Sequence, residues 1–432
     1  MARADLEYFS EWMGYVNPPH ILEWYKLATS PSTKRLLILG PRSHAKTECL
    51  SINLSSWWMG RDRNIRVLLV GNTDSQASAL VRQIRLRVEG SEAYRRLFLG
   101  LEKEAVLWND SALQVQRPRI QKDPTISGLG VLGPILGKRA DLIVCDDIVD
   151  LENSSTQLQR DKLDIWFREV LTPVLEPDGK MIMIGSSYHY DDLYARLEKG
   201  GEYTVKKYRA LREDGSALWP ERWPLDKLEE KRREMGSILF NVQFMCEPSG
   251  MRGELLRDEW LKRWDSPPVS SFPVYAGIDP ALGEGDLQAI ASVAYDRTRN
   301  VAYLVDVWAE RLPFPDFLRQ VRRSFEAYRY EKMFLESNAF QKVMMYQPDL
   351  RGLPLVESVT DRDKERRFIA MSSHFEAGRV LVNPVLLRGS EFKSEWLQFP
   401  RGKNDDALDA VEIVLRNLVG EQGGDVDAFV FR

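Results

Sequence analysis

Cysteine and histidine are both scarce in this chain, which has three cysteines and four histidines among its 432 residues. The cysteines, Cys49, Cys145 and Cys246, lie about a hundred residues apart. The chain therefore lacks the material for a disulfide framework or for a Cys/His zinc site. Any bound metal ion must be held by oxygen ligands.

Long apolar runs are also missing. A membrane-spanning helix needs roughly 18 apolar residues, whereas the longest apolar runs here are short pieces such as Val67–Val70 and Leu142–Cys145. The first residues include Asp5 and Glu7 where a secretory signal would need its apolar stretch. We therefore expect a soluble protein of the cytoplasm.

Neither sign of charge dominates the composition. Lys and Arg number 60 against 64 Asp and Glu, and the formal net charge of -4 excludes a histone-like protein coated in positive charge. A local basic groove remains compatible with this balance. The content of 44% hydrophobic and 29% charged residues is that of a globular chain, and its length predicts two or three domains.

The first part of the chain has an α/β pattern. Between residues 34 and 185, short apolar runs at 36–39, 67–70, 142–145 and 181–184 alternate with helical patterns, which predicts a mostly parallel sheet. A helical pattern from Pro224 to Phe244 follows, and a turn-rich stretch then breaks it. We predict an N-terminal domain over 1–245, with a small linker subdomain near 205–245, and a linker over 246–270.

The second part has a different order of elements. Strand patterns at 274–279, 289–295 and 301–307 predict a three-stranded meander, with a hairpin turn at 296–300. A helix at 314–328, a strand at 332–335 and a final helix at 405–418 follow. We predict a second α/β domain over 271–420 and a mobile tail over 421–432.

A phosphate-binding loop is expected where the first strand ends. The segment from Gly40 to Thr47 matches G-x-x-x-x-G-K-[ST] except that Ala45 replaces the second glycine. In such a loop Lys46 reaches the β- and γ-phosphates of ATP, and the Thr47 hydroxyl ligates Mg²⁺. The alternative is a chance Gly and Lys flanking a helix start. The expected loop consists of Gly40, Pro41, Arg42, Ser43, His44, Ala45, Lys46 and Thr47.

Two further strand ends carry candidate ATPase residues. The apolar run after Ala140 closes on Asp146, which would hold the Mg²⁺ complex, and Asp147, which would orient or deprotonate the attacking water. A helix N-cap is the alternative role for Asp147. The run at 181–184 ends in Ser186 and Ser187, a position from which hydroxyl groups can sense the γ-phosphate.

Two arginines could stabilise the transition state of ATP hydrolysis. Arg42 lies inside the loop and Arg139 just ahead of the acidic strand, so one could act in cis and the other from a neighbouring subunit. Surface ion pairing is the alternative for Arg139.

Acidic residues also end separate elements in the second part of the chain. They are Asp279, Glu336, Asp405, Asp406 and Asp409. Converging carboxylates repel one another unless divalent cations lie between them, and two Mg²⁺ or Mn²⁺ ions about 4 Å apart are held in this way for phosphodiester cleavage. The alternative for each single acid is the ordinary preference of aspartate for helix starts.

Six motifs together resemble the large terminase subunit of tailed bacteriophages, over about residues 17 to 418. The resemblance implies an additional-strand P-loop ATPase domain followed by an RNase H-like nuclease domain. It implies ATP and Mg²⁺ as cofactors and, in the nuclease site, Mg²⁺ or Mn²⁺. The motifs are Pro41–Thr47, Lys138–Asp147, Ile184–Tyr194, Leu218–Pro224, Gly277–Ala281 and Asn404–Ala410.

The resemblance also implies roles for single residues. It makes Asp146 the Mg²⁺ aspartate, Ser186 and Ser187 the coupling motif, and Asp279, Glu336 and Asp406 with Asp405 the nuclease ligands. Many family members have glutamate where this chain has Asp147, so Glu152 is an alternative catalytic carboxylate. The sequence leaves open which of Asp405, Asp406 and Asp409 ligates metal. The stretch Asn17–Tyr25 resembles the adenine-contacting region of the family, or caps the core.

We therefore expect an ATP-driven DNA packaging motor that is also a two-metal endodeoxyribonuclease. The expected partners are double-stranded DNA, the portal protein, the small terminase subunit and further copies in a ring on the portal. The protein would act in the host cytoplasm, dock transiently on the procapsid and be absent from the virion. Alternatives are a helicase-nuclease of DNA repair and a DNA-binding protein with a nucleotide switch. Oligomeric state in solution, packaging strategy, cut-site preference and preferred nuclease metal stay open.

Overall fold

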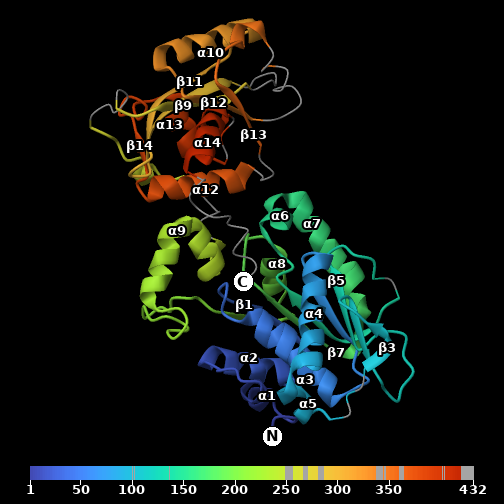
Figure 1. Ribbon diagram of the computed structural model, residues 1–432. Coiled ribbons are helices and arrows are strands. Elements are labelled where there is room, and N and C mark those ends of the chain that lie inside the picture. Colours follow the sequence, from blue (N-terminus) through green and yellow to red (C-terminus); the bar gives the residue numbers. More distant parts are fainter. Residues whose placement is uncertain are drawn as a thin grey trace. The chain divides into compact units, whose positions relative to one another are not determined.

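The computed structural model describes residues 1–99, 101, 103–135, 137–248, 256–265, 271–280, 287–336, 344, 347–359, 364–400, 402 and 404–419. The chain divides into two compact units (Figure 1). The first comprises Met1–Glu230 and Phe240–Gly250, and the second comprises Lys231–Leu239 and Met251–Arg432. The predicted tail over 421–432 and part of the predicted linker over 246–270 lie outside the described residues.

An eight-stranded sheet forms the centre of the first unit, in the order β3-β4-β5-β2-β6-β7-β1-β8. From β5 to β8 in that order neighbouring strands pair in parallel, whereas β4 pairs antiparallel with both β3 and β5. The strand β7 lies between β1 and β6, which is the additional-strand arrangement. The strands are β1 Arg35–Leu39, β2 Val67–Gly71, β3 Lys103–Trp108, β4 Ala112–Val115, β5 Ile126–Gly130, β6 Ala140–Asp146, β7 Leu175–Gly185 and β8 Thr204–Lys207.

Helices cover both faces of this sheet. Alternate residues of β1 point to opposite faces, so Leu36 and Ile38 join one hydrophobic core while Leu37 and Leu39 join another. One face carries α1 Leu6–Trp12, α2 Pro19–Thr29, the π-helical η1 Thr47–Asn53, α3 Leu54–Arg61, α4 Asp74–Gly90 and α5 Glu92–Leu97. The other carries α7 Gln157–Ile165, η2 Trp166–Leu171, η3 Thr172–Val174 and α8 Leu193–Gly200, and α6 Leu151–Ser155 packs against α7.

The helix α9, Leu225–Phe244, is kinked. Gly236 has a φ of 78°, a left-handed value that interrupts the helix and that a side chain would strain. A Cβ at this position would lie 2.9 Å from the Cβ of Ser373. The middle of α9 packs with the second unit, and its end packs with the first. The sequence interpretation assigned the whole of this helix to the N-terminal domain.

A six-stranded sheet forms the second unit, in the order β13-β12-β9-β10-β11-β14. The antiparallel meander β9-β10-β11 is joined by β12, which pairs in parallel with β9, and β13 extends this side in parallel. This topology is the RNase H-like one. The strands are β9 Val274–Asp279, β10 Gln288–Asp296, β11 Val301–Glu310, β12 Lys332–Glu336, β13 Leu355–Ser358 and β14 Val380–Val382.

The helix α14, Asp406–Val419, packs almost fully buried against β9 and β10. Gly277 permits this approach because a Cβ there would lie 2.1 Å from the carbonyl oxygen of Ala410. α10, Phe314–Tyr328, buries Phe317 and Val321 in a separate core. The remaining helical elements are η5 Asp258–Trp260, η6 Pro348–Leu350, α12 Lys364–Glu376 and α13 Glu391–Gln398.

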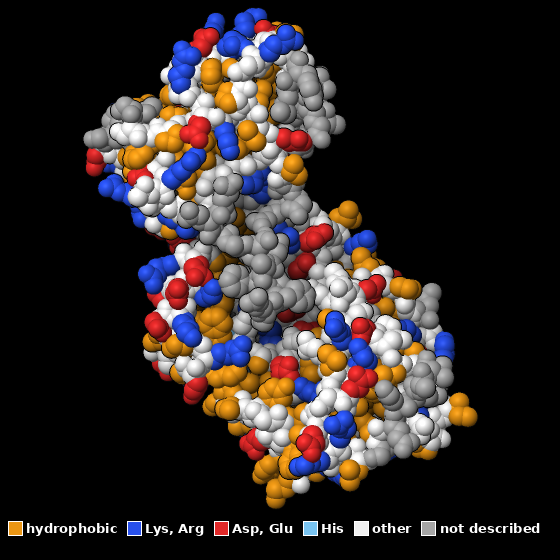
Figure 2. All heavy atoms as spheres, viewed as in Figure 1, with side chains coloured by type: hydrophobic (Ala, Val, Ile, Leu, Met, Phe, Trp, Pro, Cys, Tyr) orange, Lys and Arg blue, Asp and Glu red, His pale blue; other side chains and the backbone are white. Residues whose placement is uncertain are grey.

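The surface matches the balanced composition. Figure 2 shows Lys and Arg interspersed with Asp and Glu over much of each unit on the face drawn. In the part of the chain that the structure describes, no helix combines the length and apolar character that crossing a bilayer requires.

Candidate nucleotide and nuclease sites

The loop from Gly40 to Thr47 connects β1 to η1, as the sequence predicts. Ser43 and Ala45 have φ values of 60° and 65°. Such left-handed residues turn successive backbone N–H groups into a concave, anion-binding nest. Ala45 therefore adopts the conformation for which the usual motif uses glycine, at a cost of about 1 kcal/mol. The loop leads directly into a helix N-terminus, which also favours anions.

The side chain of Lys46 lies inside the loop. It is buried, and its Nζ donates hydrogen bonds to the carbonyl oxygens of Gly40, at 2.7 Å, and Pro41, at 3.0 Å. The ammonium group is thus held beside the nest that would receive a phosphate.

Asp146, the last residue of β6, meets the first turn of η1. The Thr47 hydroxyl donates to Oδ1 at 3.0 Å, and the Ser51 hydroxyl donates to Oδ2 at 2.6 Å. Burial and the charge of Asp147 raise the pKa of Asp146 to about 7, against the opposing effect of these two hydrogen bonds. Ser51 was missed by the sequence analysis, although it lies four residues after Thr47 and so on the same helical face.

Thr47 and Asp146 fit a Mg²⁺ ion. Both offer the oxygen donors that Mg²⁺ prefers, and they already touch each other. Because burial disfavours the negative charge of Asp146, a nearby divalent cation would stabilise its ionised form.

Asp147 has a strained and exposed position. Its φ is 46°, and its backbone N–H donates to the carbonyl oxygen of Ile184 at 2.9 Å. Left-handed non-glycine residues of this kind concentrate at functional sites. The N-cap of α6 is Asp150, not Asp147, so the helix-cap alternative does not apply. Glu152 is exposed in the first turn of α6.

The end of β7 contacts the loop through Ser186. Its hydroxyl donates to the carbonyl oxygen of Gly40 at 3.1 Å, and the N–H of Gly40 donates to the carbonyl oxygen of Gly185 at 3.0 Å. Ser187 instead donates to Asp192, the N-cap of α8, at 3.4 Å. The two serines therefore have different surroundings, and Ser186 is the one tied to the loop.

Aromatic residues hold the loop from its outer side. The buried His44 ring lies parallel to Trp223, with centroids 5.9 Å apart and an interplanar angle of 8°. Trp223 Nε1 donates to the carbonyl oxygen of Ser43 at 3.3 Å, and the N–H of Arg42 donates to that of Gln243 at 2.8 Å. Burial lowers the pKa of His44 to about 3, so the ring is neutral. The sequence analysis assigned no role to Trp223 or Gln243.

His20, in the stretch that resembles an adenine-contacting region, belongs to the same aromatic group. Its ring centroid lies 4.9 Å from that of Trp24, 5.6 Å from that of Trp219 and 6.3 Å from that of His44. Burial lowers its pKa to about 4. The stretch therefore lies next to the loop and also contributes to the core.

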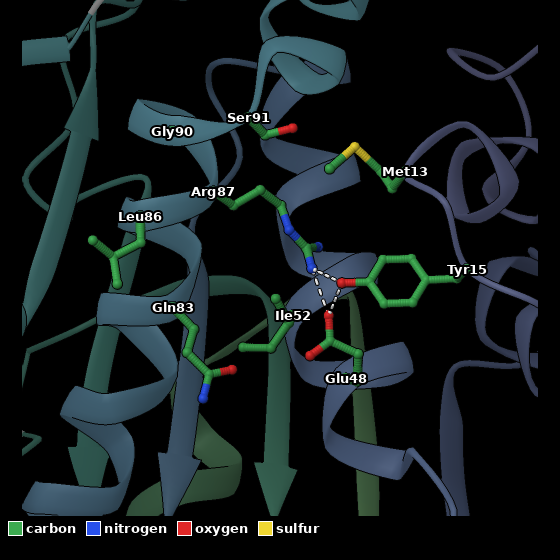
Figure 3. A pocket seen from close by; sticks show the side chains of 9 residues that line it. All are labelled: Met13, Tyr15, Glu48, Ile52, Gln83, Leu86, Arg87, Gly90 and Ser91. Carbon is green, nitrogen blue, oxygen red and sulfur yellow. Dashed lines mark hydrogen bonds and ion pairs between the residues drawn. The ribbon is translucent and has the colours of Figure 1, made fainter. Parts of the chain in front are cut away.

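An ion-paired network supports η1 from α4 (Figure 3). Arg87 contacts Glu48 Oε1 at 2.5 Å, the Tyr15 hydroxyl at 2.8 Å and Asn53 Oδ1 at 2.6 Å. Arg87, Glu48 and Tyr15 border an open pocket of about 490 Å³ that Met13, Gln83 and Leu86 also line. Because Glu48 directly follows Thr47, the network fixes the helix turn that begins the phosphate site.

The two candidate arginines have different locations. Arg42 is half-buried in the loop, and its guanidinium donates to Gln243 Oε1 at 3.4 Å. Arg139 is exposed at the opposite end of β6 from Asp146. The length of that strand, roughly 20 Å, separates it from the loop of its own chain. The structure therefore does not bring Arg139 and the loop of the same chain together.

The acids of the second unit begin at adjacent strand ends. Asp279 ends β9 and Glu336 ends β12, and in this parallel pair Ile278 lies opposite Leu335. The two acids are therefore neighbours across strands about 4.8 Å apart.

The other three acids, Asp405, Asp406 and Asp409, lie at the start of α14 and make different contacts. Asp406 Oδ2 accepts a hydrogen bond from the N–H of Leu287 at 3.0 Å. Asp405 and Asp409 both contact Lys364 Nζ, each at 2.5 Å. Burial raises the pKa of Asp409 to about 6.

Arg367 of α12 lies among the same acids. Its guanidinium is 3.2 Å from Asp409 Oδ1, 3.5 Å from Glu336 Oε1 and 2.8 Å from Glu412 Oε2. Sequence reasoning missed Lys364, Arg367 and Glu412. A helix whose face repeats acids at positions 405, 409 and 412 could have indicated that cations lie opposite it.

The donor set suits a hard divalent cation, because it consists of carboxylate oxygens. Asp409 Oδ1 is buried and accepts no hydrogen bond, although Arg367 is near. Within the described ranges, however, no three acidic, His or Cys side chains are arranged as a metal site. The sequence predicts carboxylates that converge on metal ions, whereas protein cations lie between Glu336, Asp405 and Asp409 in this structure.

No family model matches the chain. The large terminase subunit of Enterobacteria phage T3 is 26% identical over 228 residues, which cover 45% of this chain. The match spans only 37% of the T3 protein.

Among solved structures, the large terminase of a thermophilic bacteriophage has a TM-score of 0.55 at 12% identity, covering 94% of this chain and all (100%) of that one. The same phage protein in complex with ATP-γ-S has a TM-score of 0.51 at 13% identity, covering 92% of this chain and 97% of that one. These similarities confirm the predicted fold class. In sequence over part of its length, and in fold over nearly all of it, the chain resembles the large terminase subunits of bacteriophages.

Proposed function

We propose that this chain is the ATPase and nuclease subunit of a viral DNA packaging motor. ATP hydrolysis in the first unit would drive double-stranded DNA into a procapsid, and the second unit would cut concatemeric DNA in a metal-dependent reaction. The contact between Thr47 and Asp146 carries the ATPase half, because it joins a phosphate loop to an acidic strand end 99 residues away in the chain.

In the proposed ATPase site the backbone N–H groups of residues 42–47 and the Lys46 ammonium bind the phosphates of ATP. Thr47 and Asp146 would hold Mg²⁺, which when bound neutralises charge that develops on the phosphates. Asp147 orients the attacking water and accepts its proton, with Glu152 as the alternative carboxylate. Ser186 responds to the γ-phosphate and transmits its loss to β7 through the Gly40 contact.

Arginines would complete this site. The Arg42 guanidinium lies in the loop and would contact the γ-phosphate in cis. Arg139, exposed at the far end of β6, would act on the nucleotide of a neighbouring copy. This division of roles supports a ring of copies assembled on a portal protein.

In the proposed nuclease site Asp279, Glu336 and Asp406, with Asp405 or Asp409, would hold Mg²⁺ or Mn²⁺. Such ions, when bound, lower the pKa of water and stabilise the charge of the leaving oxygen. The carboxylates at the ends of β9 and β12 and at the start of α14 would hold the ions, and Gly277 lets α14 pack closely on β9.

We further propose that the small terminase subunit and double-stranded DNA are its partners. Phosphate contacts without base readout would let any DNA sequence pass. The protein would act in the cytoplasm of the infected host, dock transiently on the procapsid and be absent from the virion.

Paired variants test both activities. Lys46→Ala should abolish ATP hydrolysis and leave Mn²⁺-dependent nicking of plasmid DNA intact, whereas Asp279→Ala should do the reverse. Circular dichroism verifies that each variant is folded. Loss of both activities in either folded variant would contradict two separable sites, and strand displacement by the wild-type chain would favour a helicase-nuclease instead.

A further inference from the structure

Two cations of α12 occupy the acidic group of the second unit. Lys364 Nζ lies 2.5 Å from both Asp405 Oδ1 and Asp409 Oδ2. Arg367, one helical turn later, contacts Glu336, Asp409 and Glu412. The carboxylates are thus already compensated by side chains of the protein.

The two cations differ in exposure. The side chain of Arg367 is 9% exposed and is surrounded by buried acids, with Asp409 at 6% and Glu412 at 4%. The side chain of Lys364 is 39% exposed, and its partner Asp405 is 35% exposed. Lys364 is also the first residue of α12. A flexible, partly exposed ammonium can leave its partners far more easily than a buried planar guanidinium with three partners, two of them buried, can.

A divalent ion would need the atoms that Lys364 now contacts. Asp405 Oδ1 and Asp409 Oδ2 each have an ammonium proton donor at 2.5 Å, a separation at which a metal ion cannot also enter between them. Arg416, a further cation near these acids, lies 3.4 Å from Glu412 and 3.9 Å from Glu336 and does not contact the two oxygens that Lys364 holds.

We propose, on the basis of the proposed nuclease function, that Lys364 is an internal counter-ion that a divalent metal ion displaces from Asp405 and Asp409. Arg367 remains in place and keeps Glu336 and Glu412 together in both states. Lys364 is therefore a positioning residue: it holds the acids at their metal-free spacing and weakens metal binding in proportion to the strength of its two ion pairs.

Metal affinity gives the first test. Mn²⁺ is titrated into the full-length chain without DNA by isothermal calorimetry. Lys364→Met should lower the Kd for Mn²⁺ about tenfold, because two partly exposed ion pairs no longer oppose binding. Lys332→Met is the matched control: it removes an exposed lysine at the opposite end of β12 from Glu336 and should leave the Kd unchanged.

A second measurement separates displacement from a simple effect of charge. Lysines of the wild-type chain are reductively methylated with ¹³C, and their NMR signals are followed as Mg²⁺ is added. The Lys364 signal, assigned by its absence in Lys364→Arg, should move toward the position of solvent-exposed lysines. This readout needs no substitution in the protein that is titrated, so it stands even where Lys364→Met fails to fold.

The outcomes are distinct. An unchanged Kd in folded Lys364→Met, or a Lys364 signal that stays fixed while Mg²⁺ binds, overturns the displacement and leaves the nuclease proposal standing. Absence of Mn²⁺ binding in both wild type and variant overturns the metal site and this inference together. A lower Kd together with a moving signal supports the inference.

Discussion

Trp223 lies parallel to His44, 5.9 Å away between ring centroids, and bonds through its indole N–H to the carbonyl oxygen of the preceding Ser43. A residue 180 positions after Ser43 in the chain therefore fixes the outer side of the phosphate loop. The imidazole is neutral because burial lowers its pKa to about 3, so the contact persists across the physiological pH range.

Removal of the Trp223 contacts with His44 and Ser43 should weaken nucleotide binding. We expect Trp223→Ala to lower kcat/KM for ATP about tenfold, equivalent to roughly 1.4 kcal/mol and within the range of an aromatic contact plus a hydrogen bond. Trp223→Phe should recover most of the activity through the retained stacking. Trp12→Ala, which truncates a half-exposed tryptophan in α1, serves as control. Equal activity of Trp223→Ala and wild type would contradict a role for Trp223 in nucleotide binding.

The Arg87 network should matter for stability. Arg87→Met leaves Glu48 and Asn53 without a buried cation and should reduce the free energy of unfolding by about 3 kcal/mol. Arg96→Met breaks an exposed pair with Glu92 and should change it by less than about 0.5 kcal/mol. Urea denaturation measures both. Similar values for the two variants would show that the network is not stabilising.

Gly277 should tolerate no side chain. Gly277→Ala places a Cβ 2.1 Å from the backbone oxygen of Ala410, so α14 must move away from β9. We expect a loss of about 3 kcal/mol or more, as for severe overpacking, together with loss of nicking. Gly200→Ala is the control for a glycine substitution, because a Cβ added at Gly200 would meet no other part of the protein within 4 Å. Thermal unfolding followed by tryptophan fluorescence reports the effect.

Glu395 should make stability depend on pH. Burial raises its pKa from 4.5 to about 8, while Oε2 accepts a hydrogen bond from the N–H of Leu408 at the start of α14. The folded protein holds this proton more tightly than the unfolded chain does. The stabilisation that protonated Glu395 adds to the free energy of unfolding is therefore complete below about pH 4.5 and is lost as the pH rises through about 8.

The corresponding variant is Glu395→Gln. It keeps an acceptor for Leu408 and removes the titration, so the decrease in unfolding free energy between about pH 5 and about pH 8.5 should shrink by a few kcal/mol. Glu326→Gln, exposed in helix α10, should not alter the pH profile. A profile for Glu395→Gln that matches wild type would contradict the proposed protonation.

Local patterns predicted most of the elements that carry the candidate sites. The strand at Val274–Asp279 and the helix at Phe314–Tyr328 have the predicted bounds, because an unbroken apolar run and a strongly one-sided helix are visible within a short window. The succession of β9, β10, β11 and β12 along the chain is also predicted from such apolar runs. Asp146 and Thr47 meet as expected since carboxyl ends of parallel strands share one edge.

Other features depended on contacts between distant segments. β13, β14, α12 and the hairpin of β3 and β4 went unpredicted, since their strands are short and α12 is rich in charge. The sequence around Lys364 and Arg367 carries no local sign of their partners, because only the fold places these two cations against Asp409 and Glu412. In the same way, the direction of β6 decides that Arg139 lies at the end of this strand opposite to Asp146.

Ala45 has one more consequence for the phosphate loop. Its methyl group makes the left-handed conformation costly, yet it also removes many of the open conformations that glycine would allow before nucleotide arrives. The loop is therefore preorganised, and less chain entropy is lost when a phosphate binds. Replacing Ala45 with glycine would relieve the strain and at the same time give the empty loop more freedom, so the two effects on affinity oppose each other.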